Sequence, residues 1–176
     1  MLRLDARGLA AALAQGHPVQ PEELVDFEYR GISLNLPGLV ERLTWKTFVK
    51  AFIRDGATGQ LRGWNVRLRQ EGIDGPVTPL LRGGEPFCFG PFAILAHDGR
   101  GAPRPCAPGV LLDYGQGSRK LDPTRALRDP LVALRPGDPT FLLGWSYVAL
   151  GGLTFATPSF FLLERLGPPR HVPRLG

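Results

Sequence analysis

The stretch that decides the fold is residues 47–70, which read TFVKAFIR, DGATGQ and LRGWNVRLRQ in succession. The middle segment, 55–60, holds two glycines that can adopt the positive φ of a tight reversal. Along the second arm, apolar side chains alternate with polar ones: Trp64, Val66 and Leu68 are interleaved with Gly63, Asn65, Arg67 and Arg69. This period of two predicts an antiparallel hairpin whose second strand is half-buried, with apolar side chains pointing inward and basic ones outward.

Segments of the same kind recur on both sides of the hairpin. We expect further strands over residues 27–34, 87–96, 110–114, 131–134, 141–150 and 160–165. We expect short helices over residues 1–16, 21–25 and 37–45, near the N-terminus, and one more helical turn at 123–127. A sequential run of about eight strands is typical of an antiparallel up-and-down barrel, which leaves no strand edge exposed. A two-sheet sandwich has the same local pattern and stays open as an alternative.

The composition favours one globular domain. The chain has 176 residues, of which 43% are hydrophobic and 21% charged, so it can bury an ordinary core. Its 23 glycines and 18 prolines are spread between the apolar runs and argue against a long helical bundle. We therefore expect a mainly β protein with a single barrel domain over residues 1–176, a helical extension at 1–20 and a flexible proline-rich tail at 167–176.

The net charge of +5 comes from scattered arginines, since Lys46, Lys50 and Lys120 are the chain's only lysines. Nucleic-acid binding needs basic residues clustered with aromatic ones, so a solvated basic surface is the better interpretation. No stretch approaches the roughly 20 apolar residues of a membrane span, and the apolar run at 9–14 is short for a secretory signal. We expect a cytoplasmic protein that binds neither nucleic acid nor membrane, and a homodimer stays open.

Metal and cofactor motifs are missing from the sequence. His17, His97 and His171 lie far apart and have no partners at ligand spacing. Neither a phosphate-binding glycine loop nor a Gly-x-Ser-x-Gly elbow occurs. We expect no metal and no cofactor. Cys88 and Cys106 lack metal-ligand spacing, and the choice between free thiols and a disulfide stays open.

Two strand segments carry a family resemblance. The first candidate strand contains Tyr29-Arg30-Gly31, and the last one, 160–165, reads FFLLER and ends in Arg165. The chain thereby resembles the lipocalin or calycin-type barrels, in which a Gly-x-Trp of the first strand meets an arginine from the end of the barrel. The tryptophan is absent here, so the resemblance implies that Tyr29 and Arg165 form the cap of the closed end.

The C-terminal strands carry a second resemblance. The stretch from FLLG at 141–144 to FFLLER at 160–165 is similar to the last part of uncharacterised bacterial barrel proteins named for a Gly-x-Trp-x-Gly motif. That motif itself does not occur in this chain, and only RGWN at 62–65 comes near it.

Aromatic residues on alternating strands suggest a ligand site. We expect a small hydrophobic molecule to bind inside the barrel among Trp64, Phe92, Trp145, Tyr147 and Phe160. Tyr114, Asp113 or Glu164 would orient it. The competing interpretation is structural: the rings form the core, the carboxylates pair with strand arginines, and the protein is an interaction module without a ligand. Three further acids lie beside prolines and are predicted to form turns: Asp122, Asp129 and Asp138.

The alternative function is catalysis on the same scaffold. A cofactor-independent cyclase, isomerase or dehydratase of bacterial secondary metabolism needs a shaped apolar cavity and an acid or base, for which Glu164, Asp113 and Tyr114 are the candidates. Glu164 shares a strand face with Phe160, whereas Arg165 shares the other face with Phe161. The sequence leaves open which of the two faces lines the lumen.

Overall fold

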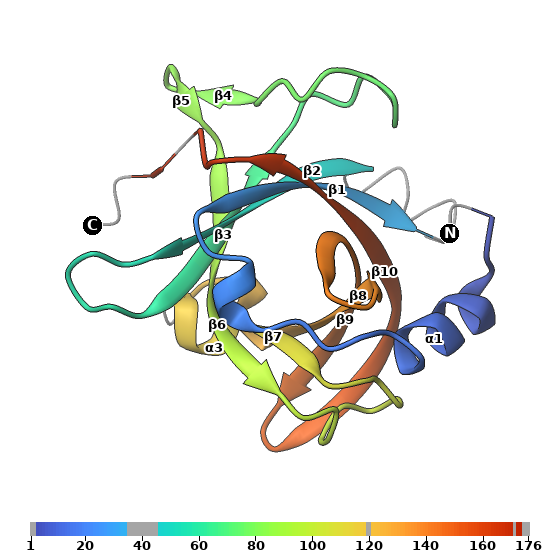
Figure 1. Ribbon diagram of the computed structural model, residues 1–176. Coiled ribbons are helices and arrows are strands. Elements are labelled where there is room, and N and C mark those ends of the chain that lie inside the picture. The colour runs from blue at the N-terminus through green and yellow to red at the C-terminus, as the bar shows by residue number, and fades with distance from the viewer. Residues whose placement is uncertain (1–2, 35–45, 119–120, 171, 174–176) are drawn as a thin grey trace.

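The computed structural model describes residues 3–34, 46–118, 121–170 and 172–173 (Figure 1). Within them, eight strands close into an antiparallel barrel in the order β1-β10-β9-β8-β7-β6-β3-β2. The strands are β1 (Phe27–Leu34), β2 (Thr47–Arg54), β3 (Leu61–Arg67), β6 (Cys88–His97), β7 (Gly109–Asp113), β8 (Leu127–Arg135), β9 (Asp138–Leu150) and β10 (Leu153–Gly167). This confirms the predicted mainly β barrel, and the pairing of β1 with β10 excludes the sandwich.

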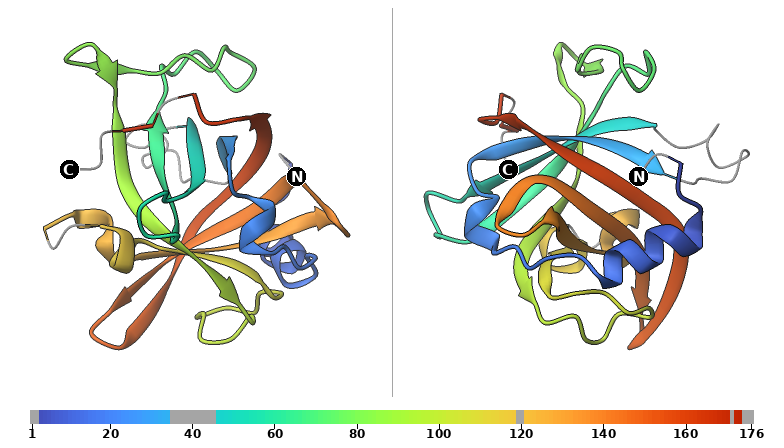
Figure 2. Two further views of the ribbon diagram at one scale, coloured as in Figure 1. Left: turned by 60° about the vertical axis from the view of Figure 1, so that its left-hand side comes forward. Right: turned by 45° about the vertical axis from the view of Figure 1, so that its right-hand side comes forward.

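Short helices and one small two-stranded ribbon lie outside the eight barrel strands. They are α1 (Ala6–Ala14), η1 (Pro21–Glu23), α3 (Tyr114–Gly117), η2 (Pro123–Ala126) and the small ribbon of β4 (Leu81–Arg82) with β5 (Glu85–Pro86). Helix α1 begins at a cap in which Asp5 Oδ1 accepts from Gly8 N at 2.8 Å, and it packs against the outside of β8, β9 and β10 (Figure 2). The helix predicted over 37–45 lies outside the described residues. In the predicted tail, Arg170 is paired with Glu28.

Buried side chains form one core inside the barrel and two outside it. The inner core contains Tyr29, Phe52, Phe92, Leu112, Leu131 and Leu163 among others. One outer core lies under α1 and includes Leu9, Leu13, Val132, Leu143, Trp145 and Phe160. The second outer core consists mainly of Val49, Ala51, Trp64, Val66 and Leu68. Several strands, such as β2 and β9, therefore bury apolar side chains on both of their faces.

The predicted orientation of β3 is wrong. Trp64, Val66 and Leu68 belong to the outer core, and Asn65 points into the lumen instead. The reason is that the chain after β3 folds back over the outside of the barrel, where Val77 packs against this cluster and Pro79 bridges to Leu68. An apolar stripe on a strand shows that the face is covered, but not which side of the sheet covers it.

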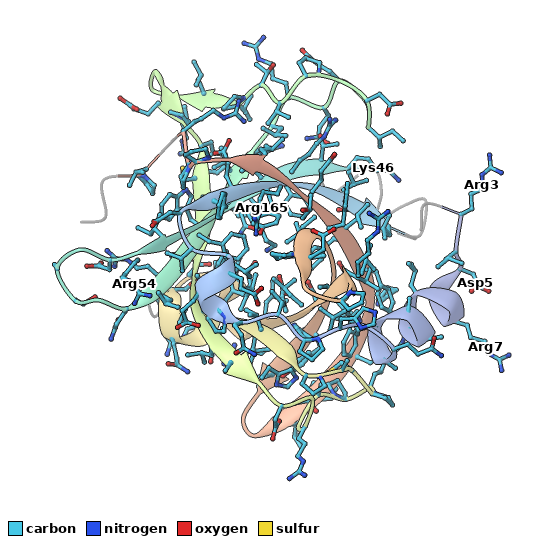
Figure 3. The ribbon with its side chains drawn as sticks, in the orientation of Figure 1. Arg3, Asp5, Arg7, Lys46, Arg54 and Arg165 are labelled. Atoms are coloured by element: carbon cyan, nitrogen blue, oxygen red, sulfur yellow. The ribbon has the colours of Figure 1, made fainter. Side chains whose placement is uncertain are left out.

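Arg165 contacts Tyr29 at one end of the barrel. Arg165 Nε and Nη2 donate to the Tyr29 hydroxyl at 3.0 and 2.8 Å, and Nη2 also donates to the Glu23 carbonyl at 2.9 Å. The Tyr29 hydroxyl in turn donates to the Pro139 carbonyl at 3.1 Å. The guanidinium carbon lies 4.1 Å from the centre of the Phe27 ring, within cation–π range. Figure 3 shows Arg165 within the ring of strands, whereas Arg54, the last residue of β2, lies outside it.

Two glycines make room for phenylalanine rings in the lumen. A Cβ placed on Gly31 would overlap the ring of Phe48, and one placed on Gly144 would overlap the ring of Phe161. The two rings lie edge to face with centres 5.9 Å apart. The glycines therefore let both rings lie flat against the barrel wall.

We predict that Gly144→Ala lowers the free energy of unfolding by about 1–3 kcal/mol, because Phe161 must move away from the wall. The matched control is Gly56→Ala in the exposed 55–60 loop, where nothing lies within 4 Å of an added Cβ. Urea unfolding of both variants measures the difference. Equal stabilities would contradict the close approach.

Candidate functional site

A pocket of about 230 Å³ lies in the lumen, toward the end of the barrel opposite the Tyr29–Arg165 contact, and opens to solvent. Its apolar walls come from Phe48, Phe89, Phe161 and Leu127. Hydroxyl-bearing residues of three strands and η2 complete the wall: Ser33, Thr124, Ser146 and Ser159. The remaining lining residues, Lys50, Asn65, Tyr114 and Asp129, are all buried and form the polar floor.

The Lys50 ammonium is the centre of the polar floor. Its Nζ donates to Asn65 Oδ1 at 2.9 Å, to the Tyr114 hydroxyl at 2.6 Å and to Asp129 Oδ2 at 3.1 Å. The residue is only 2% exposed. These three bonds use all three ammonium protons, which is what a buried lysine requires.

Aromatic rings surround the same ammonium. Nζ lies between 5.0 and 5.6 Å from the centres of four rings, those of Phe48, Phe92, Tyr114 and Phe161. The faces of aromatic rings carry a negative quadrupole that replaces part of the hydration lost by a buried cation, while Tyr114 contacts Nζ through its hydroxyl. The charge at the floor is therefore held by rings as well as by hydrogen bonds.

Strand register brings the polar groups together. Lys50 of β2 is paired directly with Asn65 of β3, so their side chains share the inner face. Asp129 of β8 is paired with Leu112 of β7, and Tyr114 follows two residues later at the start of α3. The Asn65 amide nitrogen donates to the carbonyls of Phe89 and Gly90, at 3.3 and 3.1 Å, and so ties the floor to β6.

Burial controls the protonation of the floor. It lowers the pKa of Lys50, while the charge of Asp129 and its hydrogen bond act in the opposite direction. It also raises the pKa of Tyr114 well above its usual value, and the neighbouring Asp129 charge adds to this effect. Tyr114 is therefore a neutral phenol, which donates to Asp129 Oδ2 at 3.1 Å. With Lys50 and Asp129 as an ion pair, the floor has no net charge.

One acceptor on the floor is unused. Among the described residues, Asp129 Oδ1 is a buried side-chain oxygen without a hydrogen-bond partner, although Oδ2 of the same carboxylate accepts from both Lys50 and Tyr114. Buried oxygens in native proteins are generally satisfied, so an unpaired one beside a pocket points to a bound group.

Of the five aromatic residues predicted to bind a ligand, the structure brings three together, Trp145, Tyr147 and Phe160, and their rings do not line the lumen pocket. Phe92 lies in the inner core, with its ring centre 5.3 Å from that of Tyr114. Trp64 belongs to the outer core beside β3. Trp145, Tyr147 and Phe160 lie outside the barrel in the core beneath α1.

The predicted acid–base residues are also separated. Tyr114 reaches the lumen floor. Glu164 is exposed, because the Phe161 and Arg165 face of β10 points inward. Asp113 lies on the outer wall, where its Oδ1 is 3.2 Å from Arg128 Nε. The Tyr29–Arg165 contact exists, and its role as a structural cap stays a prediction.

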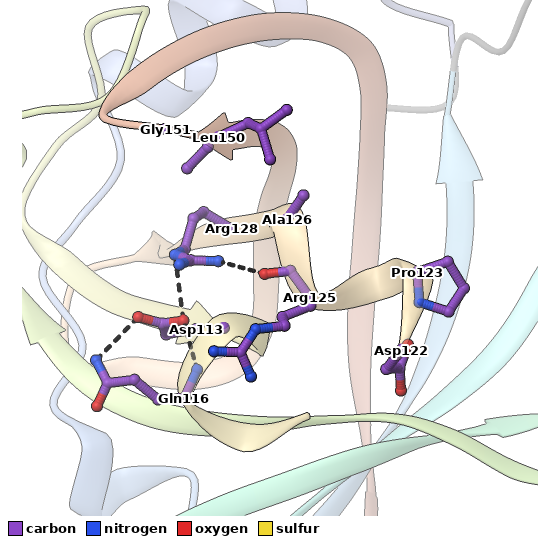
Figure 4. A pocket seen from close by; sticks show the side chains of 11 residues that line it. Asp113, Gln116, Asp122, Pro123, Arg125, Ala126, Arg128, Leu150 and Gly151 are labelled. Atoms are coloured by element: carbon purple, nitrogen blue, oxygen red, sulfur yellow. Dashed lines mark hydrogen bonds and ion pairs between the residues drawn. The ribbon is translucent and has the colours of Figure 1, made fainter. Parts of the chain in front are cut away.

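Asp113 lines a larger hollow of about 550 Å³ on the outside of the barrel. Asp113 and Arg128 in this hollow have partners in the protein: Asp113 accepts from Gln116 Nε2 at 2.9 Å, and Arg128 donates to the Arg125 backbone carbonyl at 3.0 Å (Figure 4). We consider this hollow the weaker candidate, since its polar groups have partners within the protein.

The sequence interpretation missed Lys50, Asn65 and Asp129. Lys50 alternates with Phe48 and Phe52 in a strand, and this is a signal of an inward-facing lysine. Asp129 was predicted to form a turn because Pro130 follows it, and that prediction is wrong, since both residues lie within β8. The two cysteines, whose state the sequence left open, are free thiols.

Comparisons with known proteins add no relative: no family model, no curated protein and no solved structure matches the chain. The fold and the site therefore define the class of protein by themselves. It is a closed eight-stranded antiparallel barrel with an aromatic-walled lumen pocket. In the described part of the chain, no helix combines the length and the apolar character that crossing a membrane requires.

We predict that Lys50→Met lowers the free energy of unfolding by about 3–5 kcal/mol, because the Asp129 carboxylate is left buried without its cation. The double variant Lys50→Met/Asp129→Leu replaces both charges by apolar groups and is expected to recover most of that loss. Urea unfolding provides the measurement. A double variant as unstable as the single one would show that the pair is not the reason.

We also predict that the folded protein forms less tyrosinate at pH 10 than the unfolded chain does. Burial raises the pKa of all three tyrosines, Tyr29, Tyr114 and Tyr147, above the ordinary 10.0. Above pH 10 the unfolded chain loses phenol protons that the folded protein keeps, so these groups make the free energy of unfolding fall as pH rises. Ultraviolet titration should show tyrosinate appearing together with unfolding, and an early single ionisation would refute the burial.

Proposed function

We propose that the protein binds a small, mainly apolar molecule in the lumen pocket. The observation that carries this proposal is a solvent-open pocket whose walls include Phe48, Phe89 and Phe161 and whose floor is a buried polar cluster. Such a combination, with apolar surface for affinity and a few fixed polar groups for orientation, is typical of small-molecule sites.

The size of the pocket limits the ligand. A dry engineered cavity of about 150 Å³ holds one benzene molecule. The present pocket of about 230 Å³ therefore suits a molecule of roughly two fused rings, or an aliphatic chain of similar bulk. Eight-stranded barrels that hold one small ligand in this way include the lipocalins, and we propose a lipocalin-like mode of binding. The Tyr29–Arg165 contact at the other end of the barrel supports that likeness.

A second candidate function is acid–base catalysis at the same floor. The supporting observation is that Tyr114, Lys50 and Asp129 are hydrogen-bonded to one another beside the pocket. A cofactor-independent isomerase, cyclase or dehydratase uses groups of this kind. Of the three residues predicted for the role, Tyr114 lines this pocket, whereas Asp113 and Glu164 lie outside the lumen.

A cytoplasmic location of the protein remains a prediction.

We predict that Ser146→Phe abolishes binding, because the added ring fills the pocket from β9. The matched control is Thr154→Phe, which adds the same ring at an exposed position of β10. Native mass spectrometry and isothermal titration calorimetry with methylnaphthalene measure binding. Loss in the first variant and retention in the second are expected. Wild-type protein that binds no member of a lipophilic panel, or a Ser146→Phe variant that binds normally, would refute the proposal.

A further inference from the structure

We infer that the lumen ligand carries a neutral hydrogen-bond donor, such as an alcohol hydroxyl, and that Asp129 Oδ1 accepts from it. This inference rests on the proposed function and names the chemical class of the ligand. Asp129 is 2% exposed and lines the pocket, and its Oδ1 is buried without a partner in the protein. Its Oδ2 is occupied by the Lys50 ammonium and the Tyr114 hydroxyl, so the two oxygens of one carboxylate have different tasks.

The donor protons of the other floor residues are all used in hydrogen bonds within the protein. Lys50 donates its three ammonium protons to Asn65, Tyr114 and Asp129. Tyr114 donates its only proton to Asp129. The Asn65 amide donates to the carbonyls of Phe89 and Gly90. A ketone, an ether or another pure acceptor would therefore find no free proton on the floor, whereas a hydroxyl or an N–H would find a free acceptor.

Charge selects a neutral donor. Lys50 and Asp129 already neutralise each other at 3.1 Å. The aromatic cage that could receive a cation is filled by Lys50 itself, whose Nζ is 5.0 Å from the centre of the Phe161 ring. A ligand ammonium would be repelled by Lys50, and a ligand carboxylate by Asp129, in a site where burial makes any unbalanced charge costly.

The unpaired oxygen favours a hydroxyl over an ether of the same shape. Asp129 Oδ1 has no hydrogen-bond partner in the protein, so a ligand donor that reaches it adds a hydrogen bond. A ligand hydroxyl supplies that hydrogen bond, whereas an ether of the same shape brings only a further acceptor to the carboxylate. Hydrogen bonds to charged acceptors are the stronger class, so the discrimination should reach about tenfold in Kd or more.

The experiment compares four probes on one ring system: naphthalenemethanol, its methyl ether, naphthylmethylamine as the ammonium, and methylnaphthalene. Calorimetric titration of the wild-type protein at neutral pH gives each Kd. We expect the alcohol to bind about tenfold more tightly than the ether, and the ammonium to bind more weakly than the alcohol.

Two double variants test the residue. Lys50→Met/Asp129→Leu removes the acceptor without leaving an unpaired charge, and its Kd values for the alcohol and the ether should become equal. The matched control, Asp113→Asn/Arg128→Gln, neutralises the ion pair on the outer wall and should keep the preference.

The outcomes separate the two proposals. If the ether binds as tightly as the alcohol, or the ammonium binds most tightly, the inference about the donor is overturned and the proposed lumen binding stands. The same holds if the Asp129 variant keeps the preference. If no probe binds the wild-type protein, both proposals are overturned.

Discussion

The ion pair between Lys50 and Asp129 organises the inside of this barrel. The two opposite charges lie 3.1 Å apart and are almost completely buried, so each needs a partner within the protein. Removing either one leaves the other buried without its counter-charge. Asn65 and Tyr114 complete the set with hydrogen bonds, and four rings surround the ammonium. Such a cluster contributes little net stability, but it places a fixed polar floor where apolar side chains would otherwise fill the lumen.

The barrel could be predicted from the sequence because its signals are local. The hairpin at 47–70 and the turns between the other strands depend on glycine and proline positions and on a period of two, and a meander needs little more than strand order. The inward face could not be predicted, because α1 covers one outer wall and the segment around Val77 covers another. With apolar side chains buried on both sides, Trp64 and Trp145 carried no information about the lumen.

The candidate site was missed for a related reason. Polar residues on the inner faces were interpreted as surface or turn residues, and Asp129 in particular was assigned to a turn because of Pro130. Of the polar residues that the sequence predicted for the site, Tyr114 alone belongs to the polar floor of the lumen pocket. A lysine between two phenylalanines of one strand, as in Phe48-Val49-Lys50-Ala51-Phe52, was the available signal, and it becomes decisive only when a carboxylate from a distant strand is known to face it.

The two ends of the lumen differ in how they are filled. At one end Arg165 donates hydrogen bonds to the Tyr29 hydroxyl and the Glu23 carbonyl. The rings of Tyr29, Phe52 and Phe92 pack against one another behind it. At the other end Gly31 and Gly144 hold two rings against the wall, which leaves the pocket open above Lys50. The floor of this pocket has no net charge, and its donor protons are all used in hydrogen bonds within the protein. Among the described residues of this floor, Asp129 Oδ1 is the acceptor without a partner, and under the proposed function it is the floor atom that a ligand donor would meet.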